Sequence, residues 1–249
     1  MSAAMLETLT GRNAQSVEIG IRDWEAGGYA LSYRNAVGSW WDELERSILV
    51  RSIRPRPGMR VLDAGCGVGR VAFALAQAGC HVYGLDFSFR SLRFLRLRSS
   101  LARLQVSTTL GTLTDPLPLR DRCVDAVVSC QVVQHIPSRE MRIRAWAHLA
   151  RTVRPNGRLG ALVYKSWAGE QDEGLFDKGL FYHRYTPIEL ADELRAGNWT
   201  PIRMVAYYRR TWSPWIHPGL AKAIETASAS THVADDRARY LLVIAQPSV

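Results

Sequence analysis

The sequence predicts an α/β fold in which a doubly wound, mostly parallel sheet carries helices on both faces. Segments with strand-like and helix-like patterns alternate between residues 60 and 164, as they do where helices connect parallel strands. The segment Val124–Ser129 is mostly apolar, which is typical of a central strand buried on both faces. The chain has 249 residues, 47% of them hydrophobic, and this is enough for one large core. We therefore expect residues 1–249 to form a single domain.

The first elements follow from apolar periodicity and from residues that begin or end helices. Residues 1–57 are expected to form an N-terminal helical cap, with an amphipathic helix at residues 39–54 that Pro55 ends. Ser88 is a suitable N-cap for a later helix. The patterns that follow the cap predict strands at residues 60–64, 81–85, 105–110 and 124–129, and helices at residues 70–77 and 89–103.

The last third of the chain is predicted to contain one more helix and parallel strand, followed by a segment with a different pattern. A capping box at Thr186–Glu189, with proline at the first helical position, predicts the start of a helix. Two β-rich runs then follow with no clear crossover, which favours an antiparallel pair at one edge of the sheet. The predicted segments are a helix at 139–153, a turn at 155–157, a strand at 158–164, the β-rich runs at 202–208 and 239–245, and one helix within 213–236.

The most informative stretch is V-L-D-A-G-C-G-V-G-R at residues 61–70, a strand followed by a glycine-rich turn and the start of a helix. A ligand binds at the carboxyl end of such a strand, where the turn allows the backbone to approach it closely. Glycine is required there because a Cβ atom would collide with the ligand or force a strained φ angle. The stretch therefore predicts a binding site built from this turn.

The spacing and the charge of this turn indicate which ligand it binds. A dinucleotide fingerprint would place its third glycine at position 70, which is Arg70, so the pattern is G-x-G-x-G from Gly65 to Gly69. Asp63 ends the strand, and its carboxylate would repel a pyrophosphate but attract a cationic amino group. S-adenosylmethionine carries an ammonium and a sulfonium and has no phosphate. The turn thus predicts S-adenosylmethionine as the cofactor, with S-adenosylhomocysteine as its product.

A second acid supports a nucleoside ligand. Asp86 ends the next predicted strand, where a carboxylate can accept hydrogen bonds from both ribose hydroxyls. NAD sites use the same device, so Asp86 alone does not distinguish the two cofactors. The structural alternative is a turn residue that precedes the helix cap Ser88.

With these residues the chain resembles the Rossmann-like, class I S-adenosylmethionine-dependent methyltransferases, in particular the group similar to ubiquinone-biosynthesis and other small-molecule methyltransferases. Besides the motif at 61–70, the segment L-P-L-R-D-R-C-V-D at 117–125 resembles that group's L-P-F-x-D-x-S-F-D. Q-V-V-Q-H-I at 131–136 and V-R-P-N-G-R-L at 153–159 resemble two further segments. The ordered set spans about residues 58–165 and is more specific than any one piece.

The resemblance implies a seven-stranded sheet whose last two strands are antiparallel, and it assigns the cofactor site. In the family, residues of the glycine motif line the methionine moiety, those after the second and third strands contact the ribose and adenine, and those after the fourth lie near the sulfonium. An acid is common where this chain has Thr112, whose hydroxyl would replace it. The matching positions are Asp63, Gly65, Cys66, Gly67, Gly69, Asp86, Phe87, Thr112, Leu113, Cys130 and Gln131.

Catalysis and acceptor binding are less clearly marked. His135 follows the fourth predicted strand and is the candidate general base, since imidazole titrates near neutral pH. The alternative is a histidine that packs against neighbouring loops and fixes their backbone. The loop at 166–186 is long enough to be an acceptor-side wall. The candidate acceptor-lining residues, in this loop and in the N-terminal segment, are Tyr29, Tyr33, Arg34, Trp167, Tyr182, His183 and Tyr185.

The formal net charge of +9 raises the question of a nucleic-acid partner. The arginines are scattered through predicted helices and loops, which favours a solvated surface. We therefore expect a small-molecule acceptor for methylation at oxygen, nitrogen or carbon, such as a secondary metabolite. Two rival functions stay open: a tRNA or rRNA methyltransferase, and a non-catalytic protein that binds S-adenosylmethionine.

The remaining composition argues for an ordinary cytoplasmic domain without a metal. The four cysteines form no C-x-x-C pair and no cluster with other metal ligands, so reduced thiols are expected and a metal site is not. No apolar run approaches the ~20 residues that a membrane span requires. The N-terminus lacks the charged-then-apolar pattern of a signal peptide, which predicts a cytoplasmic location.

Overall fold

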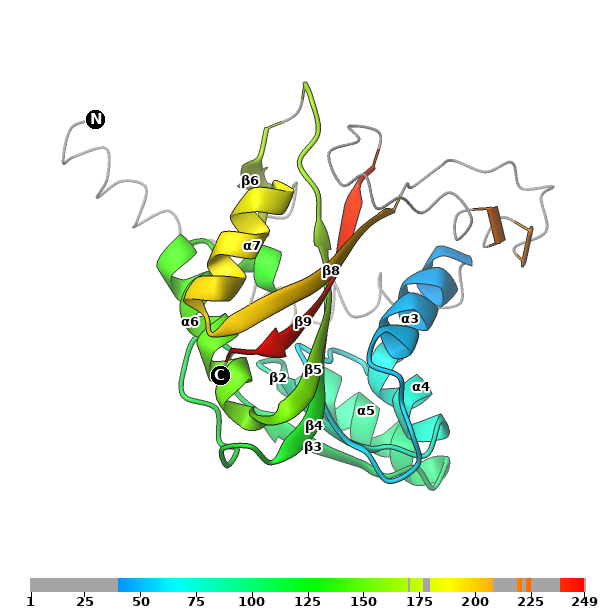
Figure 1. Ribbon diagram of the computed structural model, residues 1–249. Helices are drawn as coiled ribbons and strands as arrows, with labels where there is room; N and C mark the ends of the chain where they lie inside the picture. Colours follow the sequence, from blue (N-terminus) through cyan, green and yellow to red (C-terminus); the bar gives the residue numbers. More distant parts are fainter. Residues whose placement is uncertain are drawn as a thin grey trace.

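The sheet that the sequence predicts forms the centre of the structure (Figure 1). The computed structural model describes residues 40–169, 171–176, 180–207, 219–220, 223–224 and 238–248, and only the backbone of residues 40 and 41. A seven-stranded sheet has the order β3-β2-β1-β4-β5-β9-β8, and a separate two-stranded sheet pairs β6 with β7. The four pairings that join β3, β2, β1, β4 and β5 are parallel, while β9 is antiparallel to both β5 and β8. The predicted fold class is therefore confirmed.

Most predicted elements occur with shifts of one to a few residues. Ser88 accepts a hydrogen bond from the Ser91 N–H and caps a helix, as expected. The elements of the first half are α3 (Trp40–Ser52), β1 (Arg60–Ala64), α4 (Arg70–Gln77), β2 (His81–Asp86), α5 (Phe89–Leu101), β3 (Val106–Leu110), β4 (Val124–Cys130) and the 3-10 turn η1 (Val133–His135).

The second half contains the antiparallel strand pair that the sequence predicts. Thr186 caps α7 by accepting a hydrogen bond from the Glu189 N–H, which confirms the capping box. The elements are α6 (Arg139–Thr152), β5 (Val153–Tyr164), β6 (Glu173–Leu175), β7 (Phe181–His183), α7 (Pro187–Ala196), β8 (Trp199–Tyr207) and β9 (Tyr240–Pro247). Most of the helix expected within 213–236 lies outside the described residues.

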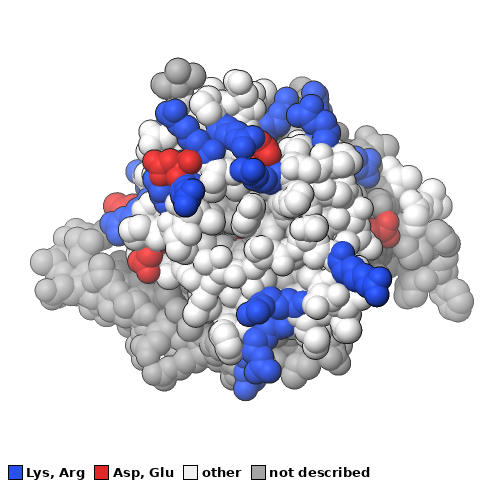
Figure 2. All heavy atoms as spheres, turned by 90° about the horizontal axis from the view of Figure 1, so that it is seen from below, with Lys and Arg blue, Asp and Glu red and all other residues white. Residues whose placement is uncertain are grey.

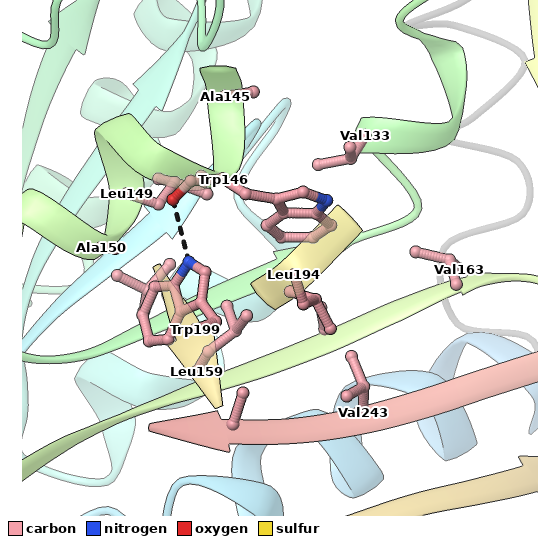
Figure 3. Close-up of a cluster of buried hydrophobic side chains, with 14 of the residues drawn as sticks. Val133, Ala145, Trp146, Leu149, Ala150, Leu159, Val163, Leu194, Trp199 and Val243 are labelled. Carbon is pink, nitrogen blue, oxygen red and sulfur yellow. Dashed lines mark hydrogen bonds between the residues drawn. The ribbon is translucent and has the colours of Figure 1, made fainter. Parts of the chain in front are cut away.

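Two cores lie on the two faces of the sheet. Helices α3, α4 and α5 cover one face, and α6 and α7 cover the other (Figure 1). In the second core, Trp146 of α6 and Trp199 of β8 are both fully buried, and the Trp199 Nε1–H donates to the Trp146 carbonyl at 2.9 Å (Figure 3). This bond fixes the antiparallel edge of the sheet against α6.

Two segments differ from the predictions. The turn expected at 155–157 belongs to β5, whose pairing with β4 shifts from Val153 directly to Arg158. The intervening residues leave the ladder as a bulge, so proline is tolerated there. The expected loop at 166–186 contains the β6–β7 hairpin, in which Glu173 pairs with His183.

A buried ion pair joins α6 to α7 beneath this hairpin. The Arg142 Nη2 donates to Glu193 Oε1 at 2.8 Å, and the Tyr185 hydroxyl donates to Glu193 Oε2 at 3.1 Å. The Arg142 Nη1 also donates to the carbonyls of Ile136 and Pro137. Arg142 therefore fixes the segment that leads from η1 into α6.

Within the described residues, no helix combines the length and the apolar character needed to cross a membrane.

Candidate active site

A cavity of about 240 Å³ opens at the carboxyl ends of β1, β2 and β4. This is the edge of the sheet at which a doubly wound fold binds its ligands. The described residues that line it are Asp63, Gly65, Cys66, Gly67, Arg70, Val71, Leu85, Asp86, Phe87, Gly111, Thr112, Leu113, Thr114, Cys130, Gln131, Val132, His135, Ile136, Pro137, Met141, Tyr164, Leu180 and Phe181. Ten of the eleven cofactor positions expected from the sequence are among them.

The glycine turn explains the exception. Gly65, Gly67 and Gly69 all have positive φ angles, which L side chains rarely adopt. A Cβ atom on Gly67 would meet no protein atom within 4 Å, so it would project into open space at the cavity wall. A Cβ atom on Gly69 would lie 2.2 Å from Leu95 Cδ1. Gly69 thus allows α4 to pack on α5 and does not line the cavity.

Asp63, which the sequence predicts to bind the methionine moiety, lies on the cavity wall. Its Oδ2 accepts a hydrogen bond from the Ala72 N–H at 2.8 Å, and the residue is only 2% exposed. Burial raises the pKa of this carboxyl to about 7, although the Ala72 amide and the Arg70 charge oppose the shift. A buried carboxyl of this kind gains from a cationic partner, and the ammonium of the cofactor would be one.

Asp86 lies one strand away, at the end of β2. Its Oδ2 accepts from the Gly67 N–H and its Oδ1 from the Ser88 N–H, both at 2.8 Å. The carboxylate is therefore oriented by the glycine turn and the α5 cap together. Each oxygen of a carboxylate can accept more than one hydrogen bond, so both can also receive a ribose hydroxyl.

The expected adenine end contains Phe87, Thr112 and Leu113, all on the cavity wall. Thr112 Oγ1 accepts a hydrogen bond from the Thr114 N–H at 3.0 Å and lies 2.5 Å from the Thr114 hydroxyl. The threonine that replaces the family's acid is thus held in a small turn of its own. Leu113 is 5% exposed, and its carbonyl oxygen is 3.0 Å from His148 Nδ1 of α6.

A buried charge cluster borders the cavity at α3. The Arg70 Nη1 donates to Asp42 Oδ1 at 2.5 Å and to Glu45 Oε2 at 3.0 Å, while its Nη2 contacts the Cys130 sulfur at 3.1 Å. The Gln131 amide donates to the other oxygen of Glu45. Burial raises the pKa of the Cys130 thiol, so it is neutral at pH 7. Arg70, Cys130 and Gln131 line the cavity, and α3 contacts Arg70 and Gln131 directly.

His135 lies on the cavity wall beside the hairpin. Its Nδ1 is 2.7 Å from the carbonyl oxygen of Phe181. A carbonyl oxygen can only accept, so Nδ1 carries the proton and Nε2 keeps its lone pair. The imidazole also meets Tyr164 edge-on, with 5.8 Å between ring centroids. Burial lowers the pKa of His135 to about 4, with the Phe181 carbonyl opposing the shift.

The acceptor-side residues expected in the loop at 166–186 do not line the cavity. The guanidinium groups of Arg184 and Arg239 lie over the Trp167 ring, 4.2 and 4.3 Å from its centroid. Tyr182 stacks on Phe176, His183 bonds to Glu189, and Tyr185 is fully buried. Phe181 lines the cavity, and alternation along β7 directs the next residue, Tyr182, to the opposite side. The other expected residues, Tyr29, Tyr33 and Arg34, lie outside the described part of the chain.

Several lining residues were not identified from the sequence. Tyr164 ends β5, and Leu180 and Phe181 enter from the hairpin, where loop residues have no periodicity to mark their orientation. Arg70 could have been identified as a lining residue, because it directly follows the glycine motif. Nothing in the sequence indicates that it pairs with two acids 25 and 28 positions earlier.

Comparison with known proteins finds a methyltransferase domain model that covers most of this cavity. A family model described as a methyltransferase domain matches residues 62–161, the segment that contains most of the lining residues. The chain is 33% identical over 154 residues to a ubiquinone biosynthesis O-methyltransferase of Xylella fastidiosa (strain 9a5c), covering 57% of this chain and 61% of that protein. It is 34% identical over 123 residues to a probable tRNA methyltransferase 9B of Mus musculus, covering 49% of this chain and 25% of that protein. The chain thus spans less than two thirds of the length of either relative.

Solved structures show the same architecture. A crystal structure of the Burkholderia thailandensis 1,6-didemethyltoxoflavin-N1-methyltransferase, with bound 1,6-didemethyltoxoflavin and S-adenosylhomocysteine, superposes with a TM-score of 0.68 at 18% identity, covering 95% of this chain and 90% of that one. At 18% sequence identity, this similarity shows that the two chains share a fold. Together with the matched methyltransferase domain and the curated relatives, it supports a class I S-adenosylmethionine-dependent methyltransferase.

Proposed function

We propose that the protein transfers the methyl group of S-adenosylmethionine to a small, flat and largely apolar acceptor that carries one hydroxyl or amine. The observation that supports this is the composition of the cavity wall beyond the cofactor residues. Most side chains of that wall are aromatic or aliphatic, and His135 contributes a ring nitrogen. The residues are Val132, His135, Ile136, Pro137, Met141, Tyr164, Leu180 and Phe181. It offers an acceptor apolar contacts and few polar ones.

The other half of the cavity fits the cofactor. In this proposal Asp63 pairs with the ammonium and Asp86 with the ribose hydroxyls, and the open space at Gly67 leaves room for a ligand against the backbone. S-adenosylmethionine, when bound, supplies a methyl group that its sulfonium activates toward nucleophiles. The volume of the cavity, about 240 Å³, lies just below the ~300–1,000 Å³ common for small-molecule sites.

His135 is the residue of this chain that we assign to the acceptor. Its Nδ1–H is held by Phe181, so the unprotonated Nε2 can accept a hydrogen bond from the O–H or N–H of the acceptor. Such a bond aligns the acceptor atom, which then gains the methyl group and loses its proton to Nε2 and from there to water. Because a pKa of about 4 makes the imidazole a weak base, alignment is its larger contribution.

Transfer of labelled methyl groups tests this proposal. The protein is incubated with methyl-labelled S-adenosylmethionine and matched sets of compounds: uncharged phenols and N-heterocycles, the same compounds carrying a carboxylate or phosphate, and RNA fractions. We expect label in the uncharged aromatic set. Label in the anionic set would overturn the apolar acceptor, and cofactor binding with no labelled product from any set would support a non-catalytic role.

A tRNA acceptor is the second candidate, because one curated relative is a probable tRNA methyltransferase. Phosphate binding requires arginine or lysine near the site. Arg70 is the one such residue among the described residues that line the cavity, and its charge is balanced by Asp42 and Glu45. Figure 2 shows basic side chains in separate groups around an uncharged area of the face seen from below. Label in the RNA fraction that falls steeply with salt would favour this candidate.

A further inference from the structure

Helix α5 carries apolar side chains on the face that points away from the sheet. Leu92 and Leu95 are buried in the core between the helix and the sheet. Phe94, Leu97 and Leu101 follow the i, i+3, i+7 spacing of one helix face, and their exposed fractions are 37%, 60% and 78%. We call these three residues the α5 stripe. A surface helix normally turns polar side chains outward, so the α5 stripe is typical of a surface that meets an apolar partner.

Positive charges surround the α5 stripe, and no nearby acid in the sequence balances them. Residues 87–114 contain five arginines and neither aspartate nor glutamate. The Arg98 guanidinium lies over the ring of Phe94, 5.7 Å from its centroid. On α7, by contrast, Arg195 contacts Asp192 at 2.8 Å. The arginines of this segment that are exposed, and that form no ion pair in the part of the chain that the structure describes, are Arg90, Arg93, Arg96 and Arg103.

The α5 stripe and these five arginines together form what we call the α5 surface, and it offers a partner two kinds of interaction. Its apolar side chains gain from leaving water, and its guanidinium groups attract anions. Ser100 has the only other polar side chain that is exposed on α5. A protein that binds in one register usually also requires hydrogen bonds and charges of both signs. The α5 surface is therefore better suited to a partner that is apolar, anionic and bound without a fixed register.

A second copy of the chain and an RNA fit the α5 surface less well than a lipid bilayer does. In a symmetric dimer, a second copy would bring the same arginines against these ones, and like charges repel. An RNA would pair its phosphates with the arginines but would leave the α5 stripe against a charged and hydrated backbone. An anionic bilayer suits both parts, because its headgroups attract arginine and its acyl chains accept phenylalanine and leucine side chains.

We propose that α5 docks the protein onto the surface of an anionic lipid bilayer. The side chains of the α5 stripe enter the boundary between headgroups and acyl chains, and the arginines lie among the headgroup phosphates. The helix stays packed on its sheet, so docking requires no membrane-spanning segment. An apolar acceptor of the kind proposed above would dissolve in the same bilayer, but the docking itself depends on neither the acceptor nor the cofactor.

Cosedimentation of the full chain with lipid vesicles tests the proposal. One set of vesicles contains phosphatidylcholine alone, and the other also contains the anionic lipid phosphatidylglycerol. At low salt, the partition coefficient should be at least about tenfold higher for the anionic vesicles, and it should fall as salt screens the arginines. Equal partition into the two sets would overturn the proposal. Salt-sensitive binding of RNA without binding to either set would also overturn it and would assign the arginines to a nucleic acid.

Two double variants separate the apolar contribution from the electrostatic one. Leu97→Gln/Leu101→Gln removes two exposed leucines and should lower partition into the anionic vesicles by at least about tenfold. Arg93→Gln/Arg96→Gln should lower it by about fivefold for each arginine and should weaken its dependence on salt. Wild-type partition in both variants would overturn the proposal.

Ile188→Gln/Ile202→Gln is the matched control. It also removes two exposed aliphatic side chains, which are 76% and 54% exposed, but it takes them from α7 and β8. Its partition into the anionic vesicles should equal that of the wild type. An equal loss in this control and in Leu97→Gln/Leu101→Gln would overturn the proposal, because the binding would not be specific to α5. Circular dichroism spectra that match the wild type show that the variants are folded.

Discussion

Nδ1 of His135 lies 2.7 Å from the carbonyl oxygen of Phe181, and this contact ties η1 to the hairpin strand β7. One side chain thereby serves two purposes. Its Nδ1–H fixes the backbone beside the cavity, and the same bond determines that Nε2 is the unprotonated nitrogen. The two interpretations of His135 that the sequence leaves open, structural and catalytic, are therefore compatible.

Two substitutions at His135 separate these roles. An asparagine can donate to the Phe181 carbonyl as Nδ1 does but has no counterpart of Nε2. We expect His135→Asn to keep most of the thermal stability, and His135→Asn and His135→Ala both to lower the rate on an O–H or N–H acceptor by about 10²-fold. Rates within a few-fold of wild type in both variants would make His135 structural and would favour an acceptor that is already nucleophilic at neutral pH.

The pH dependence of the rate gives an independent measure of the same residue. Because burial lowers the pKa of His135 to about 4, the imidazole stays unprotonated from neutral pH down to that value. The pH profile of kcat/KM should therefore have no limb from His135 near neutrality, and its protonation should reduce the rate only near pH 4. A limb near neutrality that disappears in His135→Asn would contradict this assignment.

Cofactor affinity should depend on pH through Asp63. Its pKa of about 7 means that the carboxyl of the free protein is protonated below this pH, and an ammonium beside it favours the charged form. Binding then releases that proton, so affinity should fall about tenfold for each pH unit below 7. The ammonium keeps its charge over this range. Calorimetry in buffers on either side of this pKa measures the effect. The Asp63→Asn variant should bind the cofactor more weakly, with an affinity that no longer varies with pH around the pKa.

Asp86 should contribute to binding through the ribose. Asp86→Ala removes the acceptor for both hydroxyls and should cost about 1.5–3 kcal/mol of cofactor affinity. Asp86→Asn keeps one side-chain oxygen and should lose less. Asp115 is exposed in the segment after β3, and Asp115→Ala removes the same charge without touching the cavity. Equal affinities in a folded Asp86→Ala protein and the wild type would refute the ribose assignment.

The parts of the site that sequence could predict are those that local pattern determines. Strand ends place Asp63 and Asp86 at one edge of a parallel sheet, and the helix caps Ser88 and Thr186 depend on residues three positions away. Each is a short-range relationship between a residue type and a backbone geometry. Such relationships can be read from one sequence.

The rest depends on contacts between distant segments. Asp42 and Glu45 are charged residues on a predicted amphipathic helix, where charge normally indicates solvent, and both are buried because Arg70 reaches them from α4. Likewise, the aromatic residue Trp167 contacts two arginines and does not line the cavity, whereas Phe181 of the β6–β7 hairpin does. No period or spacing in the sequence marks these partners.

The Arg142–Glu193 pair should be important for stability. Glu193 is fully buried and Arg142 is 3% exposed, so removing Glu193 leaves the buried guanidinium with the more distant carboxylate of Glu189, at 3.8 Å, in its place. We expect Glu193→Gln to lower the free energy of unfolding by about 3–5 kcal/mol, measured by denaturant titration. The double variant Arg142→Met/Glu193→Met leaves no unpaired charge and should be more stable than the single variant. A single variant that is as stable as wild type would show that the pair contributes little.

Glycine substitutions at three positions test the shape of the cofactor site. Gly67 has a φ of +51°, and an added Cβ there meets no protein atom within 4 Å. Gly67→Ala should therefore cost only about 1–2 kcal/mol of stability for its left-handed conformation, while its methyl group occupies space at the cavity wall and lowers cofactor affinity by more than about tenfold.

Gly58 provides the matched control, since it has a φ of +81°, equal open space and a position outside the cavity wall. Gly58→Ala should show the same cost in stability with unchanged affinity. Gly69→Ala should instead lose more stability than either, because its Cβ would meet Leu95 at 2.2 Å. If Gly67→Ala binds S-adenosylmethionine as tightly as Gly58→Ala does, the cofactor does not approach the backbone at this turn.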